Sequence, residues 1–330
     1  EVSLGLKDYK IAWFTEGGWQ GKVSLDNPNM RNDVSTKWLL GAEHYPIFQL
    51  PQVLEHFGEN HFDFGIVTLP KTNVDKLMTF DMMGDLKKLS NKTISMQEGP
   101  HWYYQDYTME QQIWWFNALT EFDMLFAHNW KDVNYYRGIT DKPVQKMPTL
   151  MLAERLGILP RSEWGDAVII GGNMVRWYGG FDSMIVAQQF DMPIVAPSMG
   201  RKIDREDELD IQYLPYMTWV EWIQSLSQYH VGVHMMPTHA AGTFTLNCAF
   251  HGIPCIGYKG LDTQEELHPL LSVDDGDMDT AIKLAKKLKD DKFYEECSTM
   301  CRENYMKSMY TEERCSDYLE MIFEDLYEEN

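Results

Sequence analysis

The sequence predicts an α/β protein built from two domains, each a doubly wound parallel sheet. Two observations support this fold class. The chain has 330 residues, which exceeds a typical single domain and fits two domains of about 150 residues each. Short strands that are apolar on both faces alternate with helical stretches in both halves, a pattern typical of parallel sheets covered on both sides. Two such series in tandem favour two sheets over one very large sheet.

The strands of the first half are expected at residues 10–14, 63–69, 92–96, 123–127 and 143–147. Those of the second half are expected at residues 166–172, 192–197, 210–215, 231–237 and 253–258. The segment between Met147 and Asp166 contains two prolines and a polar turn, so the boundary between the domains is placed there. We therefore expect domains at residues 1–150 and 151–310, followed by a helix over 311–330 that could pack back on the first domain.

Helical patterns close the chain. Apolar residues recur at helical spacing from Ala281 to Leu288, and Asp277 or Asp279 is the expected N-cap of this helix. Two or three further helices are expected over residues 291–330.

Composition excludes several classes of protein. The formal net charge is −21, which repels nucleic acid. No apolar run reaches the roughly 18 residues that a membrane helix needs, and the N-terminal residues lack a signal-peptide pattern. The five cysteines are odd in number, lie in the second half and form no CxxC motif, which indicates reduced thiols and a cytoplasmic protein. They are Cys248, Cys255, Cys297, Cys301 and Cys315.

A small-residue turn in the second half is the first candidate for an anion site. The expected strand 231–237 is followed by Ala240-Ala241-Gly242 and then by a helical run. The N–H groups and the dipole of a helix N-terminus attract an anion, and small residues let a phosphate approach the backbone. Thr243 and Thr245 add hydroxyl donors. The alternative is a helix cap in which small residues serve close packing of strand and helix.

Basic residues follow two other strands of the second half. Arg176 stands between two Gly-Gly pairs, where a guanidinium could bind a diphosphate with two hydrogen bonds. Arg201 and Lys202 come soon after the expected strand 192–197. An ordinary salt bridge remains the alternative for each of these cations.

The first half offers two candidate loops. Gly17 and Gly18 follow the first strand, in the position of a phosphate-approaching loop, although the stretch is neither GxGxxG nor a Walker loop and could be a plain surface turn. Residues 96–107 follow a later strand, and there Glu98 or His101 could act as acid or base. Trp102, Tyr103 and Tyr104 are aromatic surfaces on which sugars stack, unless this loop is simply polar and packed on aromatics.

No metal site is predicted. The acidic run at 274–279 precedes a helix and fits a capped turn, and the stretch at 56–61 is not an HExxH motif.

A family resemblance rests on residues 210–256 and on 122–148. The first stretch has a strand, a turn, a short helix, a second strand, a glycine turn and a helix over Phe244–Pro254 whose end is His251-Gly252-Ile253-Pro254. In this order of elements the chain resembles the GT-B glycosyltransferases, in particular their family-four-like retaining branch. The resemblance implies a GT-B fold, with two Rossmann-like domains facing across a cleft. It also implies metal-independent transfer of a sugar from a nucleotide-diphosphate donor such as a UDP- or GDP-sugar, with no further cofactor required.

The resemblance also assigns roles to the candidate residues. Arg176, Arg201 and Lys202 would neutralise the leaving diphosphate on the second domain, and the helix end at Gly242 and Thr243 would add N–H donors. Phe244, Thr245 and Asn247 lie in the same donor-side helix. The first-domain loop around Glu98 and His101, with the Gly17-Gly18 turn, would face the acceptor.

The chain departs from this family at two positions. The family signature has two glutamates eight positions apart, the first facing the donor sugar and the second the ribose; here the residues are His239 and Asn247. Both can form hydrogen bonds, but neither is a carboxylate. The alternatives are therefore an epimerase or phosphorylase on the same fold, or a catalytically silent nucleotide-sugar-binding protein.

Overall fold

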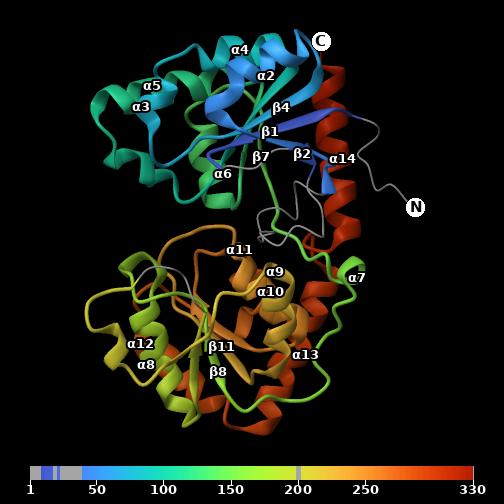
Figure 1. Ribbon diagram of the computed structural model, residues 1–330. Helices are drawn as coiled ribbons and strands as arrows, with labels where there is room; N and C mark the ends of the chain where they lie inside the picture. Colours follow the sequence, from blue (N-terminus) through green and yellow to red (C-terminus); the bar gives the residue numbers. More distant parts are fainter. Residues whose placement is uncertain (1–8, 18–20, 23–38, 198–201, 330) are drawn as a thin grey trace. The chain divides into compact units, whose positions relative to one another are not determined.

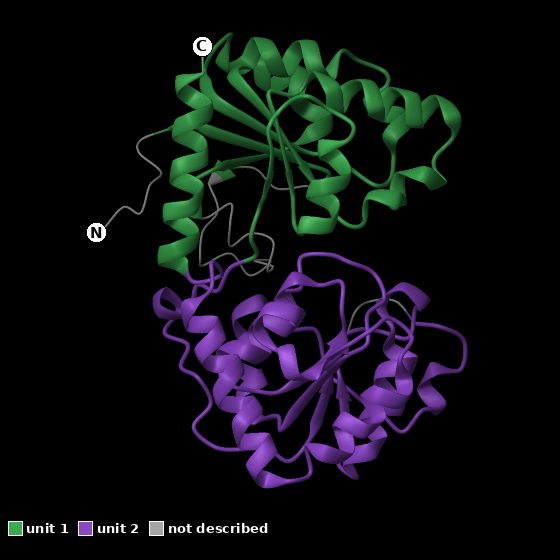
Figure 2. Cartoon of the chain, turned by 180° about the vertical axis from the view of Figure 1, so that it is seen from behind, with its two compact units in different colours: residues 1–27, 33–149, 312–330 green, residues 28–32, 150–311 purple. Residues whose placement is uncertain are grey.

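The computed structural model describes residues 9–17, 21–22, 39–197 and 202–329. The chain divides into two compact units (Figure 2). The described part of unit 1 runs as far as Thr149 and resumes from Glu312; unit 2 contains Leu150–Thr311. Within the described residues, no helix combines the length and the apolar character needed to cross a membrane.

Unit 1 contains a seven-stranded sheet in the order β2-β3-β1-β4-β5-β6-β7 (Figure 1). All neighbouring strands are parallel except β2, which runs antiparallel to β3. The five strands predicted in this half are confirmed, with ends shifted by a residue or two, whereas β2 and β3 were not predicted. The strands are β1 Ile11–Thr15, β2 Gly21–Lys22, β3 Glu43–Pro46, β4 Phe62–Thr68, β5 Ser90–Gln97, β6 Met124–Ala127 and β7 Val144–Lys146.

Helices cover both faces of this sheet. Leu125 and Ala127 of β6 belong to the core that α2, α4, α5 and α6 build on one face. Because side chains alternate along a strand, Phe126 points to the other face, where its ring contacts Phe323 of α14. The helices are η1 Ile47–Gln49, α2 Leu50–Phe57, α3 Val74–Leu77, α4 Met82–Leu89, η2 His101–Asp106, α5 Met109–Glu121, α6 Trp130–Arg137 and α14 Glu312–Glu328.

Unit 2 contains a six-stranded, fully parallel sheet in the order β10-β9-β8-β11-β12-β13. Its five predicted strands are confirmed as shorter segments, and β13 was not predicted. The strands are β8 Val168–Ile170, β9 Ile194–Ala196, β10 Gln212–Tyr213, β11 Val231–His234, β12 Cys255–Tyr258 and β13 Ser272–Val273.

Helices cover both faces of this second sheet as well. One face packs on α8, α12 and the start of α13, and the other packs on η6 and α10. Asp277 is the N-cap of α12, since its side chain accepts a hydrogen bond from the N–H of Thr280. All five cysteines are buried free thiols. The helices are α7 Ala153–Leu156, η3 Arg176–Tyr178, α8 Gly180–Ala187, η4 Gln188–Phe190, η5 Glu206–Glu208, α9 Trp219–Ser225, η6 Leu226–Gln228, α10 Thr243–His251, α11 Asp262–Leu267, η7 Pro269–Leu271, α12 Met278–Lys287 and α13 Asp291–Lys307.

The predicted fold class is thus confirmed: two doubly wound α/β units. In such sheets the loops after the carboxyl ends of the strands form the binding edge, and nearly all the candidate residues lie in these loops or in the helices that follow them.

Candidate functional site

The binding edge of unit 2 is centred on the start of α10. Gly242 is the N-cap residue with φ +74°, and it offers no side chain to cap the helix. A Cβ at this position would lie 2.0 Å from Oγ1 of Thr263. The residue must therefore be glycine for backbone conformation and for packing. The helix N-terminus is also left without a side-chain cap, which suits an anion.

The two threonines and the phenylalanine of α10 differ in exposure. Thr243 is partly exposed at the first position of the helix. Thr245 is fully buried, and its hydroxyl is shared between the carbonyl of Gly242 (3.0 Å) and Oγ1 of Thr263 (2.6 Å). Phe244 packs in the core of unit 2, with its ring 5.2 Å from that of His234. Thr245 and Phe244 therefore hold the helix in place, and Thr243 is the threonine better exposed to a ligand.

Asn247 is the unusual residue of this helix. It is 0% exposed, yet neither its Oδ1 nor its Nδ2 has a hydrogen-bond partner among the described residues. Nδ1 of His234, at the end of β11, is likewise unpartnered, and burial lowers the pKa of this histidine to about 4. Buried polar atoms without partners are rare in folded proteins and require an explanation, such as a ligand or ordered water.

His239 stands at the other position where the family that the sequence resembles has a glutamate, and it is buried in the loop between β11 and α10.

The loop after β8 brings Arg176 to the same edge of the unit 2 sheet. A Cβ at Gly179, where φ is +66°, would lie 1.8 Å from the carbonyl oxygen of Met235. The glycine therefore lets this loop pack directly against the chain that follows β11. Arg176 itself is exposed, so it is available to an anionic ligand.

Lys202 forms an ordinary salt bridge, which was the alternative to ligand binding for this cation. Its Nζ lies 2.6 Å from Oδ1 of Asp207 and 5.1 Å from the centre of the Tyr213 ring, and both charged side chains are exposed. Arg201 and Gly18 lie outside the described residues.

In unit 1, side chains tie the loops after β1 and β4 together. The carboxylate of Glu16 accepts hydrogen bonds from Thr72 (2.6 Å) and Asn73 (2.7 Å). The exposed Gly17 donates its N–H to Oγ1 of Thr15, which also pairs with Nε2 of His44. The first glycine of the predicted turn is thus positioned by its own strand.

His101 is the best-positioned candidate acid or base. It follows β5, and both its backbone N–H (3.0 Å) and its Nδ1 (2.8 Å) contact Oδ1 of Asp132. Its ring stacks on Tyr135 of α6, with centroids 4.0 Å apart. Asp132 is 1% exposed and its Oδ2 accepts a hydrogen bond from Asn129. The sequence interpretation missed Asp132 and Asn129, although both lie just after a predicted strand, 123–127.

The remaining residues of this loop have mixed environments. Glu98 is half-buried and forms no ion pair with a described residue, whereas Trp102 is exposed. Tyr104 is fully buried, stacked on Trp115, and donates its hydroxyl to the carbonyl of Leu69. Tyr104 is therefore a core residue and not a sugar-stacking surface.

Several solved structures have this architecture, and each of the three described here matches nearly the whole chain. HepE from Anabaena, in complex with UDP and glucose, has a TM-score of 0.65 and 8% sequence identity, covering 96% of this chain and all of that one. Sucrose-phosphate synthase from Thermosynechococcus elongatus has a TM-score of 0.66 and 12% identity, covering 97% of this chain and 99% of that one. An α-glucosyltransferase in complex with UDP and mismatched DNA has a TM-score of 0.62 and 12% identity, covering 96% and 100%.

These similarities show that the chain has the GT-B fold, as the sequence resemblance predicts. No protein-family model matches the sequence, and no curated protein matches it.

Proposed function

We propose that this chain is a glycosyltransferase that uses a nucleotide-diphosphate sugar, with UDP as the favoured nucleotide. The observation that carries the proposal is the start of α10, a helix N-terminus without a side-chain cap. The same helix contains the buried Asn247, whose amide has no partner within the described part of the chain. It lies at the binding edge of a GT-B unit, and similar structures such as HepE contain UDP or UDP-glucose.

Leaving-group stabilisation is the main chemical demand on the donor side. The bond between the anomeric carbon and the diphosphate oxygen breaks, and the electron pair leaves with the diphosphate, while the acceptor oxygen bonds to the anomeric carbon. The first-turn N–H groups of α10 and the guanidinium of Arg176 supply positive charge for the leaving group, so we propose that no metal is needed. Asn247 binds the ribose, and His239 faces the donor sugar. Glu98 and His101 are the candidate acid or base on the acceptor side. Retention of the anomeric configuration follows from the family resemblance.

A thermal-shift screen against UDP, GDP, ADP and dTDP, each with EDTA, tests donor binding. A nucleotide at 100 times its Kd adds about 2.7 kcal/mol to the free energy of unfolding. We expect the largest shift with UDP. The absence of a shift with every nucleotide would reject the proposal.

An Arg176→Ala variant tests the cation, and we expect it to weaken UDP binding roughly tenfold or more, since hydrogen bonds to charged groups contribute about 1.5–3 kcal/mol. Lys283→Ala is the matched control, because Lys283 is an exposed cation of the same unit that pairs with Asp279 on α12. Equal affinities in the two variants would remove Arg176 from the site.

The missing glutamates favour a second candidate, a silent nucleotide-sugar-binding protein. Binding of UDP without turnover of UDP-sugars against a broad acceptor pool would support it. An epimer formed without any acceptor would instead identify an epimerase. NMR of the first-formed glycoside reports whether the anomeric configuration is retained.

A further inference from the structure

Lys71 is a cation of unit 1 that lies at the edge of the sheet where the parallel strands end. It follows β4 closely in the chain, and its side chain is half-buried. Its Nζ lies 5.2 Å from the centre of the Tyr103 ring, in the loop after β5, which is within the range of a cation–π contact. Because β4 and β5 are neighbouring parallel strands, the loops that follow them meet at the same edge of the sheet.

A glycine makes room for the end of this side chain. Gly99 has a φ of +72°, and a Cβ placed on it would lie 2.5 Å from Nζ and 3.0 Å from Cε of Lys71. The ammonium therefore lies against bare backbone of the loop after β5, with the Tyr103 ring close by. Lysine side chains lose much rotamer freedom when they are ordered, and here two residues of one loop hold the charged end in place.

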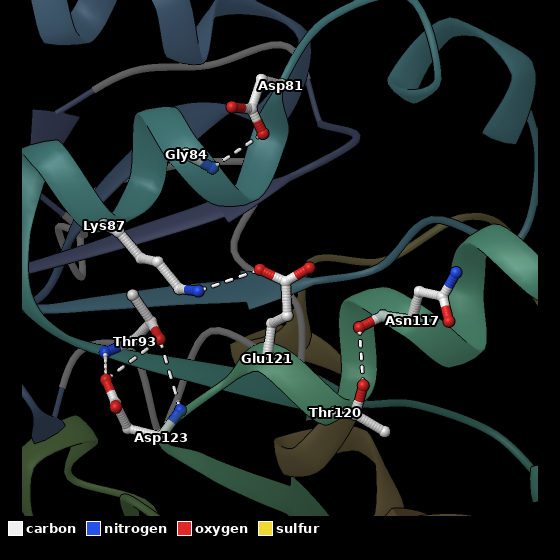
Figure 3. Close-up of polar contacts among 8 residues, drawn as sticks. All are labelled: Asp81, Gly84, Lys87, Thr93, Asn117, Thr120, Glu121 and Asp123. Atoms are coloured by element: carbon white, nitrogen blue, oxygen red, sulfur yellow. Dashed lines mark hydrogen bonds and ion pairs between the residues drawn. The ribbon is translucent and has the colours of Figure 1, made fainter.

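Lys71 has no counter-ion within the described part of the chain. No hydrogen bond or ion pair joins it to another described residue, although the sequence holds 50 acidic residues against 29 lysines and arginines. Lys87 of α4 is the ordinary case, because its Nζ lies 2.9 Å from Oε2 of Glu121 and both side chains are about half exposed (Figure 3). Burying a charge without a partner is unfavourable, so the position of Lys71 requires an explanation.

Two carboxylates of neighbouring loops leave this ammonium unpaired. Glu16, in the loop after β1, instead accepts hydrogen bonds from the two residues that follow Lys71, at 2.6 and 2.7 Å. Glu98 directly precedes Gly99 and forms no ion pair with Lys71. The ammonium is thus held in position by uncharged groups and stays available to an anion.

We propose that Lys71 binds a phosphate group of the acceptor, so that the sugar is transferred to a small phosphate ester. This inference rests on the proposed function, in which the loop around Glu98 and His101 is on the acceptor side and unit 2 binds the donor diphosphate. A lysine ammonium is a compact point charge with three donors, which suits phosphate oxygens, whereas the fork of arginine matches a planar carboxylate. The net charge of −21 repels a polyanion far more than an ester with one or two negative charges.

Binding is tested without turnover by ¹³C NMR of protein labelled at the lysine ε-carbon, at constant ionic strength. The signals of Lys71 and Lys87 are identified as those missing from Lys71→Met and from Lys87→Met. We expect glycerol 3-phosphate and glucose 6-phosphate to shift the Lys71 signal with saturation, and glycerol and glucose to leave it unchanged. The Lys87 signal should not respond. A Lys71 signal that responds to neither phosphate ester, or only in parallel with that of Lys87, overturns the inference.

Kinetics with UDP-glucose as donor provide the second test. We expect Lys71→Met to raise KM for the phosphorylated acceptor about 10- to 100-fold, the usual effect of losing a hydrogen bond to a charged group, with kcat changed less than threefold. Lys71→Arg keeps the charge and should recover part of the loss. Lys87→Met is the matched control, since it removes one cation of the same unit, and it should keep the KM of the wild type.

Affinity for UDP distinguishes the acceptor side from the donor side. Because unit 2 binds the donor diphosphate under the proposed function, the Kd for UDP should be the same in Lys71→Met and in the wild type. Weaker binding of UDP in Lys71→Met would assign Lys71 to the donor and overturn the inference. A Lys71 signal that responds to a single-stranded DNA oligonucleotide more strongly than to either ester would also overturn it.

The outcomes separate this inference from the proposed function. Saturable binding of a phosphate ester at Lys71, in a protein that turns over no sugar donor, would reject the proposed function and still support an anion site. Transfer to unphosphorylated acceptors only, equal in the wild type and Lys71→Met, would support the transferase and overturn the inference. If Lys71→Met does not fold, Lys71→Arg identifies the same signal and the wild-type titration decides.

Discussion

Asn247 is a residue that is unfavourable for the fold and that the proposed function would account for. Its amide is fully buried and has no partner among the residues that the structure describes, whereas the hydroxyl of Thr245, two residues earlier in α10, makes two hydrogen bonds. An unpaired buried polar group costs about 1–3 kcal/mol. The unliganded protein therefore carries a cost at Asn247, which under the proposed function a bound ribose would remove.

Replacing Asn247 with leucine should consequently raise the stability of the unliganded protein by about 1–3 kcal/mol, since it removes the unpaired amide at similar volume. The same change should abolish the stabilisation by UDP. Both are measured by thermal unfolding with and without nucleotide. Thr245→Val is the contrasting control and should lower stability, because the carbonyl of Gly242 and Oγ1 of Thr263 lose a partner. A destabilised Asn247→Leu protein would contradict the explanation.

Some site residues could be predicted from the sequence and others could not. Gly242 and His101 could be proposed because a strand, a turn and a helix start are visible in local patterns. Asp132 could not, because it is 31 residues from His101 and the two meet only because β6 pairs with β5 in the sheet. The burial of Tyr104 could not be predicted either, since an aromatic side chain in a loop can point into the core or into solvent.

At the level of elements, strand prediction succeeded where both faces are buried. The central strands β1, β4, β5, β8 and β11 are buried over most of their length, and all were predicted. Strand β3 was missed because its sequence is Glu-His-Tyr-Pro, in which two of the four residues, Glu43 and Pro46, disfavour strands. Its pairing with β1 depends on tertiary contacts that no local pattern reveals.

The helix α14, from the C-terminal end of the chain, contributes to the core of unit 1. The Phe323 ring is fully buried and lies 4.8 Å from Phe64 and 6.0 Å from Phe126, centroid to centroid. We expect Phe323→Ala to destabilise unit 1 by about 3–5 kcal/mol, the usual cost of truncating a core phenylalanine.

The matched control is Met321→Ala, on the exposed side of the same helix. It should change stability by less than about 0.5 kcal/mol, as exposed substitutions usually do. Urea unfolding, followed by circular dichroism, measures both variants. Equal effects would mean that α14 does not depend on this packing.

At the scale of the whole molecule, acid stability depends on two opposing effects. The formal charge of −21 at pH 7 creates self-repulsion that weakens as carboxylates take up protons. Most carboxylates protonate only near pH 4, so this effect is small between pH 7 and 5. Three buried histidines of unit 2 titrate differently, because burial lowers the pKa of His234, His251 and His268 from 6.5 to about 4.

The sign of the histidine effect follows from proton binding. Between pH 6.5 and 4 the unfolded chain binds protons at these three histidines and the folded chain does not, so acid favours unfolding. Their contribution to stability is complete above pH 6.5 and is lost as the pH falls towards 4. At pH 5 each histidine should lower the free energy of unfolding by about 2 kcal/mol.

His268 allows this prediction to be tested at one position. Its Nδ1 accepts from the N–H of Cys255 (3.2 Å) and its Nε2 donates to the carbonyl of Thr245 (2.9 Å). A glutamine can offer one acceptor and one donor, so His268→Gln can keep this bridge between β12 and α10 while removing the titrating group. We expect urea midpoints of the wild type to fall from pH 7 to pH 5, and those of His268→Gln to fall by about a third less. A wild-type midpoint that does not change over this range would show that the self-repulsion term, and not histidine burial, controls the acid response of the molecule.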